Sequence, residues 1–452
     1  MGSEQLLASF VRNVSYSDLD EDTINTVKHQ IVATCGALIA GSRSAVAAAV
    51  DFVNDMGGKP EATVFVYGTK VPAQHAAFAN AAMGRALDID DHISPGAHIG
   101  GAAVPAAFAA AELAGGCTGK DLITAIAAGT EISLRLKLEE EDYAGFDPTG
   151  VTAVFSSAAA ASHLMGLDET QIWNALGLVS DRSGASFQHF IDGVLAGPVM
   201  QGWVAQAGVE CARLAQRGIT GVSNYLEGGY GYFHLYGKGK ADISHVTRGL
   251  GKEWHLPNLN FKKYPSCGMT QSGTELILEM MVEHGFLAGD VERIEIVMPP
   301  YGFKLVGHPF KIGANPRVDA QFSAAYCVAN ALIRAPVTLS HFEAEQVNDP
   351  EVAGFAKEKV SVSMDPAVDR THYAVDIRVF TKDGKTHLGQ TDVPPGTPAK
   401  PMTDGQHRQR LYDCAVFSGK QWFKGREEAI LDYVGSLEEK EDVGGLINLF
   451  LP

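Results

Sequence analysis

The chain has 452 residues, of which 46% are hydrophobic and 20% charged, so it is long enough for two domains and apolar enough to be globular. Acidic residues outnumber basic ones by 53 to 36, and the net charge of −17 argues against nucleic acid and anionic membranes as partners. The six cysteines are scattered without a CxxC pair, which argues against a disulfide framework and cysteine-bound metal clusters.

The start of the sequence has no basic segment followed by an apolar core, so we expect no signal peptide and a cytoplasmic protein. The most apolar run, residues 100–116, is built of Ala and Gly but contains Pro105 and Glu112. This composition predicts a packed helix and not a membrane span.

Helical patterns dominate the first 264 residues. Residues 23–38 carry apolar side chains at three- and four-residue steps and stop before Gly41, as an amphipathic helix does. Thr118 and Asp121 form a capping-box pattern at the start of another helix.

Two prolines mark further helix starts. Asp147 followed by Pro148 predicts an N-cap with proline at the first helical position. Pro198 opens a second such segment, which Gly218 closes.

After residue 265 the pattern changes to strands mixed with helices. Asp383 and Gly384 predict a hairpin turn, and residues 319–333 read as a helix. Strands are predicted over 291–300, 359–364, 372–380 and 386–393. The last fifty residues return to helical periodicity, so we expect a mainly α protein: a large all-helical domain of residues 1–264 with 400–452, and a smaller α+β domain of residues 265–399.

The segment ALDIDDHISPGAHIG, residues 86–100, gathers three aspartates and two histidines. If a helix end continued here, Asp88 would share a face with Asp91 and His92, and the Ser-Pro-Gly turn would present His98 from a loop. A carboxylate beside an imidazole in a dry pocket can transfer protons, and Asp88, between Leu87 and Ile89, is our candidate base.

Two other uses of these residues remain open. Asp and His also bind zinc, iron or manganese, but the sequence has no HExxH motif or EF-hand loop, so we expect no metal. Asp90 and Asp91 are equally explained as helix caps or solvent-facing residues.

The second candidate segment is FKKYPSCGMTQSG, residues 261–273, at the boundary between the predicted domains. In a protein this acidic, Lys262 and Lys263 are a place to bind an anionic substrate, and a partly buried Lys262 can also exchange a proton. The alternative is a solvated basic pair at a linker.

Weaker candidates lie elsewhere in the helical half. Arg135 ends a helix, where it can clamp a carboxylate or satisfy helix carbonyls, and Arg182 and His189 can line a cleft. Tyr143 is a candidate acid/base hydroxyl, although it follows an acidic run. The sequence has no nucleophile elbow, P-loop or dinucleotide fingerprint.

Several motifs, in order along nearly the whole chain, resemble the MmgE/PrpD family. They are ALDIDDH, PGAH, VPAAFAAAELAG, CTGKDLITAIAAGTEI, DPTG, YPSCGMT, DAQFSAAY and HFEAEQVNDPEV. The resemblance implies a helical main domain, a smaller α+β domain that closes over a cleft, a homodimer, and no metal or organic cofactor. It places functional roles on Asp88, His92, His98 and Lys262.

The chain departs from the family pattern at four positions. Asp147 replaces a histidine, although an N-cap role is a sufficient reason for an aspartate there; Gly197 and Met200 stand where many members carry a lysine and a histidine, and Gly268 replaces an arginine. Each change removes a cation or proton donor, so we expect either compensation by Arg182 and His189 or a smaller, less charged substrate.

We therefore expect a cofactor-independent lyase of dehydratase type that acts on a small anionic carboxylic acid. Candidate catalytic residues are Asp88, His98, Lys262 and Tyr143; candidate substrate-binding residues are His92, Arg135, Lys263, Arg182 and Asp147. The alternatives are an epimerase with two bases, such as Lys262 opposite Tyr143 or His98, a decarboxylase, and a non-catalytic binding protein.

Overall fold

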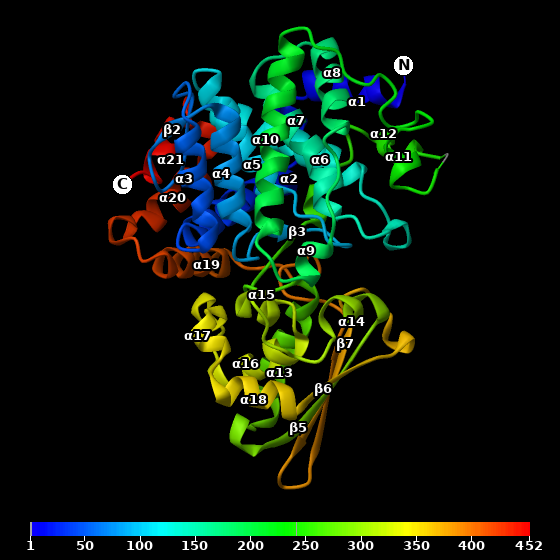
Figure 1. Cartoon of the computed structure of the whole chain (residues 1–452), viewed down its shortest axis with the longest axis vertical. Coiled ribbons are helices and arrows are strands. Elements are labelled where there is room, and N and C mark those ends of the chain that lie inside the picture. Colours follow the sequence, from blue (N-terminus) through cyan, green and yellow to red (C-terminus); the bar gives the residue numbers. More distant parts are fainter. Residues whose placement is uncertain (1, 241) are drawn as a thin grey trace.

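The computed structural model describes residues 2–240 and 242–452, which form a large helical body and a smaller body built around a four-stranded sheet (Figure 1). Both ends of the chain lie in the helical body, at the top of Figure 1. This arrangement confirms the predicted mainly α fold with a smaller α+β part.

The helical body is a dense stack of helices with faces of small residues. Its centre is α7, which is buried along nearly its whole length and packs against α5, α6, α8 and α10. A Cβ atom at Gly208 of α10 would lie 2.3 Å from Ser157 of α7, so this contact requires glycine. The helices of this body are α1 (Ser3–Asn13), α2 (Glu21–Gly41), α3 (Ala48–Met56), α4 (Ala73–Arg85), α5 (Gly100–Leu113), α6 (Gly119–Arg135), α7 (Pro148–Leu164), α8 (Glu169–Ser180), α9 (Gln188–Ile191), α10 (Ala196–Gln216), α11 (Tyr232–Leu235) and α12 (Ser244–Thr247).

Capping side chains fix the predicted helix starts. The Thr118 side chain accepts a hydrogen bond from the Asp121 backbone at the start of α6, and Asp147 caps α7, both as predicted. The predicted start of α10 is two residues too late, because this helix begins at Ala196 and not at Pro198.

The apolar run after residue 100 is the buried helix α5, as predicted. None of the helices in residues 2–240 and 242–452 has by itself both the length and the apolar composition to cross a bilayer. Two consecutive segments, Glu21–Gly41 and Ala45–Met56, meet these criteria only as a pair bent by 91°.

The smaller body has one sheet with strand order β6-β5-β7-β8. Strands β5 and β6 are parallel and the other pairs are antiparallel, with the predicted turn at Gly384 between β7 and β8. Helices α13, α16 and α18 share its apolar core. The elements are β5 (Val291–Met298), β6 (Val360–Met364), β7 (Val375–Thr381), β8 (Thr386–Thr391), α13 (Gln271–His284), α14 (Pro300–Val306), α15 (Pro316–Gln321), α16 (Ala324–Arg334), α17 (Ala344–Val347) and α18 (Pro350–Glu358).

The C-terminal residues return to the helical body. Helix α19 (Asp404–Ser418) packs along α2, and α20 (Arg426–Gly435) and α21 (Gly444–Leu449) complete the same core, to which Leu411, Phe423 and Phe450 contribute. In Figure 1, α19 lies at the lower edge of the helical body, next to the smaller body.

Two short antiparallel pairs lie outside the main sheet. Strand β1 (Ala62–Thr63) pairs with β2 (Lys70–Val71). Strand β3 (Asp91–His92) pairs with β4 (Asn260–Phe261), which brings the acidic segment beside the lysine segment although about 170 residues separate them. The candidate site is built at this second pair.

Candidate active site

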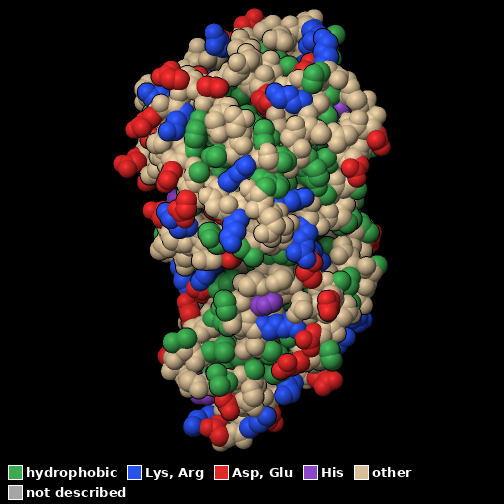
Figure 2. All heavy atoms as spheres, turned by 90° about the vertical axis from the view of Figure 1, so that its left-hand side faces the viewer, with side chains coloured by type: hydrophobic (Ala, Val, Ile, Leu, Met, Phe, Trp, Pro, Cys, Tyr) green, Lys and Arg blue, Asp and Glu red, His purple; other side chains and the backbone are tan. Residues whose placement is uncertain are grey.

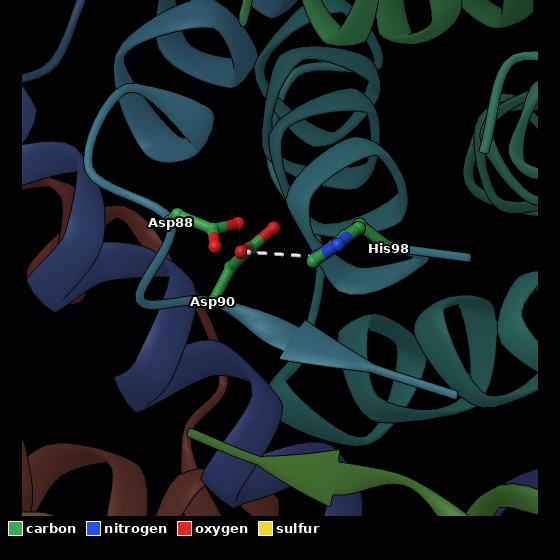
Figure 3. Close-up of side chains that lie close together, drawn as sticks. All are labelled: Asp88, Asp90 and His98. Carbon is green, nitrogen blue, oxygen red and sulfur yellow. Dashed lines mark hydrogen bonds and ion pairs between the residues drawn. The ribbon is translucent and has the colours of Figure 1, made fainter. Parts of the chain in front are cut away.

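The acidic segment is an extended turn and not a helix end. Helix α4 stops at Arg85, Asp88 has a left-handed backbone with φ of 54°, and Asp91 and His92 form strand β3. The expectation that Asp88 shares a helical face with Asp91 and His92 is therefore wrong. The turn that contains left-handed Asp88 instead directs the Asp88 and Asp90 carboxylates toward His98, as Figure 3 shows.

Neighbouring side chains hold the left-handed backbone at Asp88, a conformation that costs free energy for a residue other than glycine. Gln321 donates a hydrogen bond to the Leu87 carbonyl at 2.7 Å, and the Lys262 Nζ donates to the Asp88 carbonyl at 3.1 Å. Residues from both bodies thus fix the position of Asp88.

Two cations meet at the Asp88 carboxylate. Lys262 Nζ lies 2.6 Å from Asp88 Oδ1, and Arg85 Nη1 forms an ion pair with the same oxygen. All three side chains are buried. Because a buried charge is tolerated only beside its counter-charge, these groups stabilise one another's ionised forms.

The electrostatic environment keeps both carboxylates ionised. Burial alone would raise the pKa of Asp88, but the charges of Lys262 and Arg85 lower it below its usual range. For Asp90, burial is again outweighed, here by the hydrogen bond from His98 and the charge of Arg85, and the net shift of its pKa is downward. Asp88 is consequently a weak base, so its part in the site is to hold Lys262 and Arg85 in place.

His98 is held between Asp90 and Arg85. Its Nδ1 lies 3.1 Å from Asp90 Oδ1, and its Nε2 lies 3.2 Å from Arg85 Nη2. A guanidinium can only donate, so Nε2 must accept, and Nδ1 carries the proton that Asp90 receives. His98 is therefore a neutral imidazole with its lone pair at Nε2, the arrangement of a general base oriented by a carboxylate.

Asp90 and Asp91 have different roles, and the expectation that they face solvent is wrong for both. Asp90 is fully buried beside His98. Asp91 accepts hydrogen bonds from Gln30 Nε2 at 2.8 Å and from the Gly100 backbone at 3.0 Å, at the start of α5. The alternative of a structural cap thus describes Asp91 and not Asp90.

His92 is part of strand β3. It lies next to His98 and contacts the smaller body. Its Nε2 is 3.3 Å from the Tyr373 hydroxyl, and burial followed by the charge of Lys262 lowers its pKa well below the usual value. A Cβ atom at Gly268 would lie 2.6 Å from that Nε2. A side chain at residue 268 would therefore clash with the His92 ring, and the glycine at this position leaves room for the ring.

A metal ion fits this cluster poorly. One ligand atom each from Asp88, Asp90 and His98 lies within 4.8 Å of the others. However, Arg85 and Lys262 already neutralise the two carboxylates, and a divalent cation beside a guanidinium and an ammonium would be repelled. The carboxylates, imidazole and cations of this cluster are instead suited to proton transfer and anion binding.

A cavity of about 300 Å³ between the two bodies opens onto Asp88 and Arg85. Arg43 and Phe190 line it from the helical body, and Arg317 and Phe322 from the smaller body. Pockets of this size bind small molecules. Figure 2 shows several Lys and Arg side chains at the surface around the level where the bodies meet.

Three predicted binding residues point elsewhere. Arg135 pairs with Glu131 and donates to the Arg248 and Glu253 carbonyls, which lie outside α6, so it neither faces the Asp88 cluster nor satisfies the carbonyls of its own helix. Lys263 pairs with Glu275 at 2.8 Å, away from the Asp88 cluster.

Arg182 is half exposed and lies 3.9 Å from Glu210. It lines a different cavity, of about 500 Å³, together with His189. The expectation that Arg135, Lys263 and Arg182 meet the substrate beside Asp88 is thus not met by the geometry.

Asp147 and Tyr143 lie on another side of the cluster. Asp147 Oδ1 caps α7 through the Thr149 and Gly150 backbone, and its Oδ2 lies 3.2 Å from His189 Nε2. Tyr143 lines a cavity of about 210 Å³ with Tyr301, and burial raises its pKa above the usual value. Asp147 thus has the predicted capping role and, in addition, an imidazole partner.

Sequence reasoning missed Arg85 as a member of the cluster. Its only signal is its position three residues before Asp88, which reads as one more exposed helix residue. It also missed Gln321 and Arg317 of α15, since nothing in the sequence shows that this helix faces the acidic segment.

Comparison with known proteins shows similarity along both bodies. Residues 5–243 match the model of the MmgE/PrpD N-terminal domain, and residues 264–431 match that of the C-terminal domain. Cis-aconitate decarboxylase of Homo sapiens is 26% identical over 98% of this chain and 93% of the relative, and that of Mus musculus is 27% identical over 84% and 79%. A cis-aconitate decarboxylase-like protein, oryM, of Aspergillus oryzae is 24% identical over 98% and 96%.

Proposed function

Because this chain belongs to the MmgE/PrpD family, we propose that it is a lyase that removes a proton next to a carboxylate of a small di- or tricarboxylic acid and expels water from the neighbouring carbon. Its relatives support an enzyme of dehydratase or decarboxylase type. The observation that carries the dehydratase proposal is the neutral His98, whose lone pair at Nε2 faces the cationic end of the cluster.

The reaction begins when the substrate carboxylate draws the guanidinium of Arg85 away from His98 Nε2. His98 then takes the proton from the adjacent carbon, and Asp90 stabilises the imidazolium through Nδ1. The electron pair of the broken C–H bond enters the carboxylate as an enediolate. Arg85 and Lys262 lie where this new negative charge develops, and preorganised cations of this kind usually supply the largest part of a rate enhancement.

Lys262 supplies the second proton. Its ammonium group, held by Asp88, protonates the hydroxyl on the neighbouring carbon, and the C–O bond breaks to release water and leave a C=C bond. His98 has gained one proton and Lys262 has lost one, so exchange with solvent restores both groups. The reaction therefore needs no oxidant or other reagent.

Decarboxylation is a second candidate, which the names of the relatives favour. In a cis-aconitate-like acid the C–CO2 bond breaks, and its electron pair spreads into the unsaturated carboxylate. Arg85 and Lys262 stabilise that charge as in the dehydration, and the Lys262 ammonium gives a proton to carbon and is restored by exchange with solvent. The two reactions share the cluster and differ in which bond breaks.

The adjacent lysines give a matched test of the site. We expect Lys262→Gln to lower turnover by about a hundredfold or more, the usual scale for a lost acid/base group, and Lys263→Gln to retain turnover within about threefold. The assay is NMR of a panel of hydroxy and unsaturated di- and tricarboxylic acids in D2O, where water loss, CO2 release and deuterium uptake give separate signals.

Each outcome has a defined meaning. Water loss, with deuterium at the carbon next to the carboxylate of the recovered substrate, supports the dehydratase, and CO2 release supports the second candidate. Deuterium uptake without elimination contradicts both and indicates an epimerase. Binding of these acids without any reaction, measured by thermal shift, would indicate a non-catalytic protein.

A further inference from the structure

The cavity above Asp88 carries more positive charge than its visible partners neutralise. Arg43, Arg85 and Arg317 line it, with Asp88 and Glu343 as the acidic side chains. Arg85 is paired with Asp88, which leaves Glu343 between the other two arginines. An excess cation inside a chain of net charge −17 needs an explanation.

Arg43 and Arg317 come from different bodies and converge on the same partners. Arg317 forms an ion pair with Glu343, and the Arg43 guanidinium lies 3.7 Å from the same carboxylate. The guanidinium carbons lie 4.9 Å (Arg43) and 5.7 Å (Arg317) from the centre of the Phe417 ring. Two like charges are thus held together by one carboxylate and one ring.

Arg317 has an unused hydrogen-bond donor. Its Nη1 is buried and has no hydrogen-bond partner in the described part of the chain, whereas Arg43 also donates to the Phe417 carbonyl at 3.0 Å. Burial and the charge of Arg43 lower the pKa of Arg317 to about 10, so it stays charged at neutral pH. A buried guanidinium N–H left without an acceptor is costly, and a carboxylate is its best acceptor.

We propose that Arg317, supported by Arg43, binds a second carboxylate of the substrate, while the first carboxylate lies at Arg85 and Lys262. The proposal rests on the proposed function, because it assigns the far end of the same substrate. It makes Arg317 the residue that selects acids with a second carboxylate over acids with only one. A diacid in this cavity bridges the helical body and the smaller body.

Arg317 also compensates for the cations that the chain lacks at other positions. Gly197, Met200 and Gly268 bring no cation to the site, and Arg182 lines a separate cavity. Arg317 supplies a cation from the opposite wall, so recognition of a second carboxylate does not depend on those positions.

Binding of matched probes tests the proposal without turnover. Glutarate has two carboxylates, and glutaramate is the same chain with one carboxylate replaced by an amide. By titration calorimetry we expect the wild type to prefer glutarate, and Arg317→Gln to weaken glutarate binding by about 10- to 100-fold while glutaramate changes by less than about twofold. Arg317→Lys keeps the charge without the planar fork and should give an intermediate loss.

Glu343→Gln gives a result of opposite sign. It removes the carboxylate that competes for Arg317 and Arg43, so glutarate should bind several-fold more tightly than to the wild type. A role of Arg317 in folding alone would not produce that gain. Arg378→Gln, the same exchange at an exposed position of β7, should leave both affinities unchanged.

Equal losses for both probes in Arg317→Gln, or no preference for glutarate in the wild type, would overturn the second-carboxylate site. Neither result touches the proposed lyase, which the Lys262 and Lys263 variants test through bond breaking. Conversely, a protein that prefers glutarate but breaks no bond would retain this inference and lose the proposed function.

Discussion

Ion pairs and hydrogen bonds between specific partners hold the residues of the Asp88 cluster in place. Asp88 holds two cations, Asp90 holds one imidazole, and each carboxylate has a second buried oxygen without a hydrogen-bond partner among the described residues. Partly satisfied buried carboxylates are costly in an inert core. Asp88 lines an open cavity, which is typical of a site that completes its hydrogen bonds with a ligand, whereas Asp90 is fully buried beside His98.

Asp90→Asn tests whether Asp90 selects the His98 tautomer. The amide oxygen could still accept from Nδ1, but the amide NH2 could instead donate and force the proton to Nε2, where it blocks the base. We expect turnover to fall by roughly a thousandfold or more with little change in KM, since removal of the charge from such a pair has effects of that order. Steady-state kinetics with a turned-over acid from the panel measure both constants. An equal loss with Asp91→Asn, which belongs to the cap of α5, would show that the effect is structural.

Asp88→Asn separates ion-pair geometry from backbone strain. Asparagine tolerates the left-handed backbone of Asp88, so the variant should fold, but it no longer balances Lys262 and Arg85. We expect turnover to fall by about a hundredfold or more. Circular dichroism checks the fold, and unchanged turnover would remove Asp88 from the site.

At the residue scale, the sequence predicted three members of the cluster but not the contacts that hold them. Asp88, His98 and Lys262 do lie together in the structure. They could be predicted because charged and polar residues in an apolar stretch of sequence indicate a buried functional site. Arg85 was missed since a helix-end arginine looks the same in sequence whether it faces solvent or a carboxylate. The left-handed turn at Asp88 was missed because its stabilising partners, such as Gln321, are distant in sequence.

Among the elements, the short pair β3 and β4 positions the site. Two-residue strands leave no periodic signal, so neither these strands nor their pairing could be predicted from the sequence. Arg410 of α19 donates to the Lys262 carbonyl at 3.0 Å, so the C-terminal segment also supports this pair. In contrast, the cap of α6 and the hairpin at Gly384 were predicted because their signals are local.

The packing of α2 against α19 predicts a pH dependence of stability. His29 and His407 stack there with ring centres 4.0 Å apart, and burial, Arg410 and His29 lower the pKa of His407 to about 2. In the unfolded chain a histidine has a pKa of about 6.5, so below that pH the unfolded state binds a proton that the folded state does not. The free energy of unfolding therefore falls as the pH falls below about 6.5, by up to about 1.4 kcal/mol per pH unit for this residue.

His407→Gln should remove that part of the slope. Urea unfolding at pH 7, 6 and 5 measures it, and the wild type should lose more stability over this range than the variant. His308→Gln, at an exposed position, serves as the control and should keep the wild-type slope. Parallel curves for wild type and His407→Gln would show that His407 is protonated in the folded protein.

On the scale of the whole molecule, the site exists only where the two bodies meet. Asp88 and Arg85 belong to the helical body, whereas Gln321 and Arg317 come from the smaller body, and all four line the same cavity. Hydrophobic patterns predicted both bodies, since each has its own core. Their mutual orientation could not be predicted, because it depends on a few polar contacts such as Gln321 with Leu87 and Arg43 with Glu343.

The most direct test of the account is chemical rescue of the base. His98→Ala removes the ring that accepts the proton and leaves a space beside Asp90 that free imidazole can fill. Deuterium uptake from D2O at the carbon next to the carboxylate should fall by about a hundredfold or more and recover in a saturable way with added imidazole, whereas His92→Ala should gain nothing from it. Wild-type uptake by His98→Ala without imidazole would contradict the account.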